Sequence, residues 1–170
     1  MTVNAYLLQL IAPALVGGLG LFALRKQSPS RRELLLCLWF GYCLSLGLQI
    51  LAPIAGWHPL DWLQRGMTAV NLTPFATLKL FYRAGGTAAK INLLGNVLVF
   101  VPLGLVPPLL WNKFRRPITG ILPGFCFSLA VECLQYFTGR SVDIDDLILN
   151  TLGAAVGWLL WRIFKKHGAD

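Results

Sequence analysis

Residues able to do chemistry gather in the last third of the chain, in and just before the stretch GRSVDIDDLILNTLG. Glu132 precedes this stretch, which contains Arg140 and the aspartates Asp143, Asp145 and Asp146. A buried carboxylic acid can serve as a general acid or base, and an arginine can hold a phosphate or a carboxylate. The close aspartates could bind Mg²⁺ or Ca²⁺ through their oxygens, or they could cap a helix N-terminus. We expect Glu132 to be the buried acid, with Arg140 as its charge partner unless an aspartate competes for it.

The composition excludes a water-soluble protein. Of 170 residues, 56% are hydrophobic and 13% are charged, and the mean hydropathy is +0.64; soluble domains carry about 25% charged residues. The apolar residues form blocks, and a membrane helix needs about 20 of them. Five blocks have the required length and character, over residues 5–24, 34–55, 91–111, 118–137 and 147–164. We therefore predict an all-α fold, a polytopic transmembrane helical bundle of about five membrane helices in a single membrane domain over residues 1–170.

The basic residues predict an orientation in the cell membrane. Ten of the 15 follow the first, third and fifth apolar segments: Arg25, Lys26, Arg31, Arg32, Lys113, Arg115, Arg116, Arg162, Lys165 and Lys166. The other five are Arg65, Lys79, Arg83, Lys90 and Arg140. Cytoplasmic loops carry an excess of lysine and arginine, so we expect an extracytoplasmic N-terminus and a cytoplasmic C-terminus. The same charge placement predicts that the first segment is a retained helix. No basic patch is interleaved with aromatic residues, so no nucleic-acid partner is expected.

The longest hydrophilic connection, residues 56–90, is expected to be extracytoplasmic. Its second half, AVNLTPFATLKLFYRAGG, combines apolar residues with Lys79 and Arg83, which favours a short interfacial or partly re-entrant helix. Its proline and glycines argue against a full span. Two interpretations stay open: a surface helix that anchors the loop, and a lid over a pocket, since long loops often carry function.

Polar residues inside the apolar segments recur at one depth. Each of three segments carries a pair spaced three or four residues apart and therefore on one helical face. The pairs are Asn92 and Asn96, Glu132 and Gln135, and Asp146 and Asn150. In the predicted orientation all three pairs lie in the outer half of the membrane. Ionisable residues in a membrane helix are costly and usually functional, which predicts a shared polar pocket. The alternative is interhelical hydrogen bonding that fixes helix register without chemistry.

The other motifs concern packing more than chemistry. Gly120-x-x-x-Gly124 and Gly153-x-x-x-Gly157 present small-residue faces that could let helices approach closely. The four cysteines, Cys37, Cys43, Cys126 and Cys133, form no C-x-x-C pair, and no histidine is placed for a zinc site. We interpret the cysteines as buried packing residues. The sequence identifies no cofactor, and whether the aspartates bind a metal stays open.

Several of these residues also stand in a recognisable order, and the chain resembles the VanZ-like family of bacterial membrane proteins. The matching stretches are Asn71-Leu72-Thr73-Pro74-Phe75, Asn92-x-x-x-Asn96, Phe100-Val101-Pro102-Leu103-Gly104, Glu132-x-x-Gln135 and Arg140-x-x-Asp143-x-x-Asp146-x-x-x-Asn150-x-x-Gly153. They cover a VanZ-like core over about residues 71–157. The resemblance implies a small multi-pass helical protein of the bacterial inner membrane, a link to glycopeptide (teicoplanin) tolerance, and a place for Asn71 among the site residues. It implies no particular reaction.

Three functions compete on this basis. In the first, the pocket binds or modifies an anionic lipid or a lipid-linked cell-envelope intermediate. Glu132, Arg140, Asp143 and Asp146 would then be catalytic, and Asn71, Asn92, Asn96, Gln135 and Asn150 would bind the substrate. In the second, the chain is a non-catalytic membrane accessory whose polar cluster is structural. In the third it is a small transporter or flippase, against which stand the small number of helices and the lack of an inverted repeat.

Overall fold

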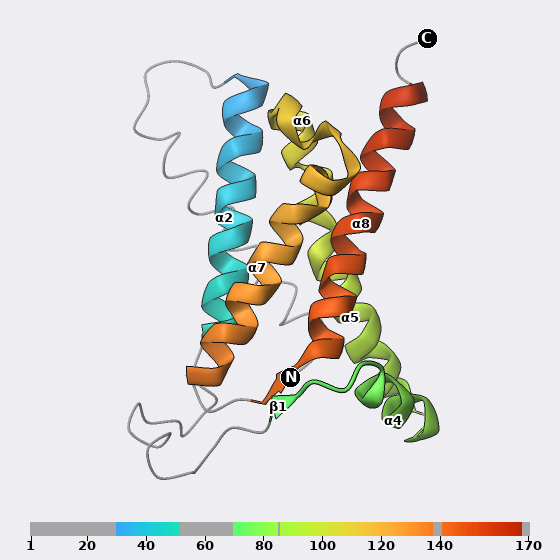
Figure 1. The fold of residues 1–170 in the computed structure, drawn as a ribbon. Coiled ribbons are helices and arrows are strands. Elements are labelled where there is room, and N and C mark those ends of the chain that lie inside the picture. Colours follow the sequence, from blue (N-terminus) through green and yellow to red (C-terminus); the bar gives the residue numbers. More distant parts are fainter. Residues whose placement is uncertain (1–29, 52–69, 85, 138–140, 168–170) are drawn as a thin grey trace. The chain divides into compact units, whose positions relative to one another are not determined.

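The protein is described by a computed structural model that places residues 30–51, 70–84, 86–137 and 141–167 (Figure 1). The chain forms two compact units, Met1–Ile54 and Ala55–Asp170. In the first unit, helix α2 (Arg31–Leu51) has 21 residues and covers most of the predicted segment 34–55. Its start is a capping box, in which the Ser30 amide donates to Glu33 Oε2 and the Glu33 amide donates to Ser30 Oγ. The predicted segment 5–24 lies outside the described residues.

The second unit contains the remaining described elements. In chain order they are β1 (Val70–Asn71), α4 (Ala76–Ala84), α5 (Thr87–Leu105), α6 (Pro107–Leu110), the 3₁₀ helix η1 (Asn112–Arg115), α7 (Pro117–Phe137), β2 (Val142–Asp143) and α8 (Ile144–His167). Helices α5, α7 and α8 form a three-helix unit, with α6 and η1 joining α5 to α7 at one end and α4, β1 and β2 at the other (Figure 1).

Glycines let α5 and α8 pack with their backbones almost in contact. A Cβ atom on Gly153 would lie 2.1 Å from the Val97 carbonyl oxygen, and one on Gly157 would lie 2.0 Å from the Val101 oxygen. A Cβ on Gly104 would lie 1.8 Å from the Ala154 oxygen. No side chain fits in these places, so the predicted close approach at Gly153-x-x-x-Gly157 is confirmed, with α5 as the partner.

Helix α7 packs antiparallel against α8 through residues spaced four apart. A Cβ on Gly120 would meet the Trp158 ring at 2.1 Å, and one on Gly124 would meet Ala154 Cβ at 2.3 Å. One turn further along α7, Ser128 Oγ accepts a hydrogen bond from Asn150 Nδ2 at 2.9 Å. The face predicted at Gly120-x-x-x-Gly124 is therefore a helix interface. The same face continues into polar residues toward the end of α7.

Three helical stretches among the described residues are long and apolar enough to cross a membrane: Leu93–Leu110, Pro117–Tyr136 and Ile144–Lys166. They correspond to the third, fourth and fifth predicted segments. The structure is thus mostly helical, as predicted. It adds one feature that an all-α prediction lacks, the short parallel pair of β1 and β2.

Two details differ from the sequence-based expectations. The third segment is divided at Val106 into α5, which ends at Leu105, and α6, which begins at Pro107. Val106 keeps helical backbone and its amide bonds the Pro102 oxygen, but Pro107 has no amide hydrogen to donate to the preceding turn. Cys126 and Cys133 are exposed on the surface of α7, so the interpretation as buried residues is wrong for them. A small apolar side chain costs little there, since the outer face of a membrane helix meets lipid instead of water.

Candidate functional site

A short parallel strand pair brings the 71–78 segment to the start of α8. Val70 pairs with Val142, and Asn71 pairs with Asp143. Asn71 Nδ2 donates to Asp143 Oδ1 at 3.1 Å, and its Oδ1 accepts from the Thr73 amide at 3.1 Å, which forms an Asx turn. Asn71 thus connects the turn before α4 to the connector before α8.

Asp145 is the most deeply buried carboxylate of this region, with 1% of its surface exposed. Its Oδ1 accepts the Phe75 amide at 2.5 Å, and its Oδ2 accepts the amides of Thr77 and Leu78 at 2.9 and 3.1 Å. These amides are among those that a helix start leaves without partners inside the helix. One of the alternatives drawn from the sequence was that the aspartates cap the helix that they precede, which is α8. Asp145 instead caps α4, a helix about 70 residues earlier in the chain.

The cap of α4 includes an unusual backbone conformation. Phe75, immediately before the helix, has a φ of 64°, in the left-handed region that residues other than glycine seldom adopt. Its amide is held by Asp145, and its side chain is half exposed. The Asp145 carboxylate therefore fixes both the conformation of this turn and the position of α4.

Asp143 completes the attachment of α4. Its Oδ2 accepts the Thr77 hydroxyl, and its Oδ1 accepts the Asp145 amide at 2.9 Å. The second bond caps α8, which agrees with the capping alternative for this one aspartate. Asp143 thus serves two helices at once, its own and α4.

Polar side chains inside the candidate spans meet at the same end of the three-helix unit. Asn96 Nδ2 on α5 donates to Asp146 Oδ1 on α8 at 2.6 Å. Glu132, on α7 and only 5% exposed, accepts the Asp143 amide through Oε2 at 3.0 Å. Asn150, 6% exposed, reaches Ser128 as described above. We name this set the polar cluster: Asn96, Ser128, Glu132, Asp143, Asp146 and Asn150.

The structure therefore brings together most of the residues singled out from the sequence. The hydrogen bonds form three separate sets at this end of the unit: Asn71 and Glu132 both bond Asp143, Asn96 bonds Asp146, and Asn150 bonds Ser128. Gln135 lies one turn from Glu132 on α7 and is half-buried. Arg140 and the side chain of Asn92 lie outside the described residues, so the Glu132–Arg140 pair stays a prediction.

The sequence analysis did not identify two residues of this region, Ser128 and Thr77. Ser128 could have been found, because Gly120, Gly124, Ser128 and Glu132 are spaced four apart and must share one face of α7. Thr77 gave no such signal. It is one of several threonines in the predicted connection 56–90, and only the strand pairing places it against Asp143.

The three aspartates do not converge on one point. Asp143 bonds Asn71 and Thr77, Asp145 bonds the α4 amides, and Asp146 bonds Asn96. Within the described ranges, no three His, Cys, Asp or Glu side chains are grouped so that they could hold a metal ion. Two of the aspartates, Asp143 and Asp145, instead hold α4 in place. The Glu132 carboxylate lies inside a candidate span, where it could donate or accept a proton.

Comparison with known proteins gives two matches. The family model VanZ/LLP1 matches residues 39–165. Protein VanZ of Enterococcus faecium is 35% identical over 104 residues, which cover 58% of this chain and 56% of that protein, so the match spans a little over half of the relative. No solved structure matches. The family match includes every residue of the polar cluster and extends beyond the expected core of residues 71–157, and the chain belongs to the VanZ/LLP1 family.

Proposed function

We propose that this VanZ-family chain is a multi-pass membrane protein whose polar cluster binds or modifies an anionic lipid or a lipid-linked envelope intermediate, and that it thereby contributes to teicoplanin tolerance. The observation that carries the proposal is Glu132, a carboxylate with 5% exposure inside the candidate span Pro117–Tyr136. Insertion scales put an aspartate or lysine at the centre of a membrane helix at about 2.5–3.5 kcal/mol, so ionisable groups are kept in spans chiefly for function.

The roles assigned to the site follow from its contacts. Glu132 acts as general acid or base, or as the acceptor of a substrate hydroxyl, and Arg140 holds the anionic group. Asp146 is oriented by Asn96 across the α5–α8 interface. Asp143 orients Glu132 through its amide and fixes α4 through its carboxylate. Asn71, Asn92, Gln135 and Asn150 supply the remaining polar groups.

The test compares Glu132→Gln and Arg140→Ala with the wild type at matched expression. Glutamine keeps an oxygen for the Asp143 amide but loses the charge and the titrating proton. We expect a marked loss of teicoplanin tolerance and a changed lipid profile in both variants. A matched control is Glu33→Gln, because glutamine is equally able to complete the capping box that Glu33 forms with Ser30. Full tolerance in both site variants would end the proposal.

The second candidate is a non-catalytic membrane accessory, and a specific observation favours it. The carboxylate oxygens of Asp143 and Asp145 accept hydrogen bonds from Asn71, Thr77 and the α4 amides. These bonds hold α4 in place, which is a structural role. An accessory of this kind would keep full function in Glu132→Gln and would turn over no lipid fraction. The same pair of measurements therefore separates the two candidates.

The orientation is also part of the proposal: five spans, an extracytoplasmic polar cluster and a cytoplasmic C-terminus. In the second unit, six described basic residues lie toward the α6 end: Lys113, Arg115, Arg116, Arg162, Lys165 and Lys166. Three lie toward the α4 end: Lys79, Arg83 and Lys90. Aromatic rings accompany the first group, with Arg162 over Trp158 at 5.6 Å and Lys165 over Trp161 at 5.5 Å. Such a charge bias favours a cytoplasmic α6 end.

Cysteine labelling checks the orientation. Ser141→Cys and Asn112→Cys place exposed thiols at the two ends, in a chain whose native cysteines are replaced by alanine. In intact cells we expect a membrane-impermeant maleimide to label position 141, and to label position 112 only after permeabilisation. The reverse pattern would invert the orientation and place the polar cluster in the cytoplasm.

A further inference from the structure

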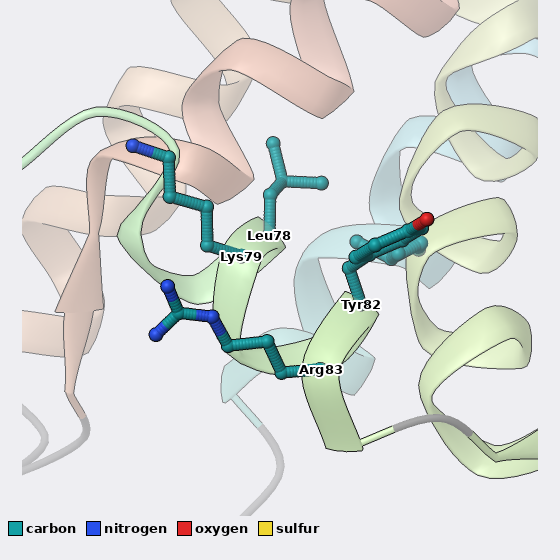
Figure 2. Close-up of a pocket in the computed structure, with 5 residues that line it drawn as sticks. Leu78, Lys79, Tyr82 and Arg83 are labelled. Carbon is teal, nitrogen blue, oxygen red and sulfur yellow. The ribbon is translucent and has the colours of Figure 1, made fainter.

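Beside the polar cluster, helix α4 forms one wall of an open groove of about 340 Å³. Leu78, Lys79, Tyr82 and Arg83 line it from α4, and Leu93 lines it from α5 (Figure 2). Lys79 and Arg83 are four residues apart, so they share one face of the helix. Figure 2 shows both extending from the same side of α4, while the Tyr82 ring lies on the other side, toward α5.

The two cations of the groove keep their charge available. Both Lys79 and Arg83 are exposed, and neither makes an ion pair with a carboxylate of the described residues. Asp143 and Asp145 contact α4 through its amides and the Thr77 hydroxyl and not through these cations. The lining of the groove is almost wholly apolar, so Lys79 and Arg83 border it with their hydrocarbon stems and carry their charges at its rim. The region next to it holds four of the chain's seven acidic residues.

An apolar surface continues from the groove along the candidate span. Leu93 is the first residue of the span Leu93–Leu110. Leu94 and Leu98, one turn apart on α5, are 60% and 64% exposed. On α4, Tyr82 is 88% exposed. A molecule seated here would meet cations at the membrane surface and hydrocarbon side chains below them. Those are the requirements of an amphiphile with an anionic head.

We propose that this groove is the docking site for the phosphate headgroup of an anionic membrane lipid. Lys79 and Arg83 contact the phosphate, and Leu78, Tyr82 and Leu93 pack against the upper part of its acyl chains. The inference rests on the proposed function and deepens it, because it gives the anionic ligand a place of first contact at the same end of the three-helix unit as Glu132 and Asp146. Charge complementarity selects this occupant: a lipid with a net negative charge offsets the two cations, whereas a zwitterionic lipid brings a cation of its own beside them.

The test uses the full-length protein in mild detergent with equal amounts of phosphatidylglycerol and phosphatidylcholine of identical acyl chains. Native mass spectrometry measures the ratio of the two lipids retained. We expect the wild type to prefer phosphatidylglycerol, and Lys79→Gln/Arg83→Gln to lower that preference roughly 30-fold, as expected for the loss of two cations near a lipid surface. Lys79→Arg/Arg83→Lys should keep it. The control is Lys113→Gln/Arg116→Gln, which removes the same charge from exposed positions at the other end.

The possible outcomes distinguish a failure of the groove assignment from a failure of the proposed anionic-lipid function. If the wild type prefers phosphatidylglycerol and Lys79→Gln/Arg83→Gln prefers it equally, the groove assignment is overturned while an anionic ligand elsewhere survives. If the wild type retains both lipids equally, the inference and the anionic-lipid function both fail. If the Lys113→Gln/Arg116→Gln control loses as much preference, the effect is one of net charge and the groove is not a specific site.

Discussion

The two halves of the three-helix unit are built in different ways. Toward the α6 end, α8 meets its neighbours through glycine and alanine, with backbones so close that no added Cβ would fit at Gly104 or Gly157. Toward the α4 end, the same helices meet through hydrogen bonds between Asn96 and Asp146 and between Ser128 and Asn150. Lipid supplies little hydrophobic force between membrane helices, so close packing and polar contacts are the available means of association.

The comparison indicates that the hydrogen bonds of the polar half depend on the helix register set by the glycine half. A glycine interface fixes helix register through sterics alone, because a shift by one residue would bring side chains into backbone. Hydrogen bonds at the polar end then form between residues that this register has already aligned: Gly120 meets Trp158, Gly124 meets Ala154, and one turn later Ser128 meets Asn150. We therefore expect changes in the glycine half to abolish the fold, and changes in the polar half to loosen it locally.

The largest effect is expected at Gly157. In Gly157→Leu the Cβ alone would approach the Val101 carbonyl oxygen to 2.0 Å, and only a backbone displacement could relieve that contact. We expect a loss of more than about 4 kcal/mol, the range of exceptional core defects, and little or no folded protein by size-exclusion chromatography in detergent. The matched control is Gly95→Leu on α5, since a Cβ there meets nothing within 4 Å. Equal yields of the two variants would contradict the proposed dependence.

A smaller and more local effect is expected at Asp145. In Asp145→Asn one of the two oxygens that accept the Phe75, Thr77 and Leu78 amides becomes an NH₂ group facing an amide hydrogen. A hydrogen bond to a charged group contributes about 1.5–3 kcal/mol, so α4 should detach while the three-helix unit stays folded. Hydrogen exchange should become faster at residues 75–78 and remain unchanged in α7.

The neighbouring carboxylate provides the control for this experiment. Asp146→Asn makes the same chemical change one residue later, but the Asp146 Oδ1 atom accepts a hydrogen bond from Asn96 on α5. Protection of residues 75–78 should therefore persist in Asp146→Asn. If both variants lost it equally, the cap of α4 would not reside in Asp145.

The smallest effect is expected at the hydrogen bond between Ser128 and Asn150. Ser128→Ala removes the acceptor of Asn150 Nδ2 in a fully buried position. Interhelical hydrogen bonds in membrane proteins contribute about 0.6 kcal/mol on average, so the loss should be of this order. A double-mutant cycle with Asn150→Ala, followed by unfolding in mixed micelles, measures the coupling. A coupling above about 2 kcal/mol would mean that the polar half also determines register, contrary to the comparison.

The three polar pairs of the site were predictable, because the spacing of residues along one helix and their distance from its end can be read from that helix alone. The spacing of Asn92 and Asn96, of Glu132 and Gln135, and of Asp146 and Asn150 placed each pair on one face before any partner was known. The length of the apolar blocks then put these faces at a common level. The glycine motifs likewise marked helix faces, although not the helix that each one meets.

The capping of α4 by Asp145 could not be predicted from the spacing of residues within one helix. Three aspartates at the start of an apolar helix look like ordinary caps for that helix, and Asp143 does serve α8 in that way. Asp145 instead reaches amides of α4, because the pairing of β1 with β2 lays the earlier segment beside it. No pattern local to either segment contains this information.

The sequence by itself indicated a helical membrane protein and predicted that polar residues of three helices lie at a common level, since both follow from the length and period of apolar runs. Only the tertiary structure decided which atoms are partners: Asn96 with Asp146, Glu132 with the Asp143 amide, and Asp145 with the start of α4. A hydrogen bond requires two atoms within about 3 Å and in line. That condition depends on the register between helices and on a strand pair that joins residues 70 and 142.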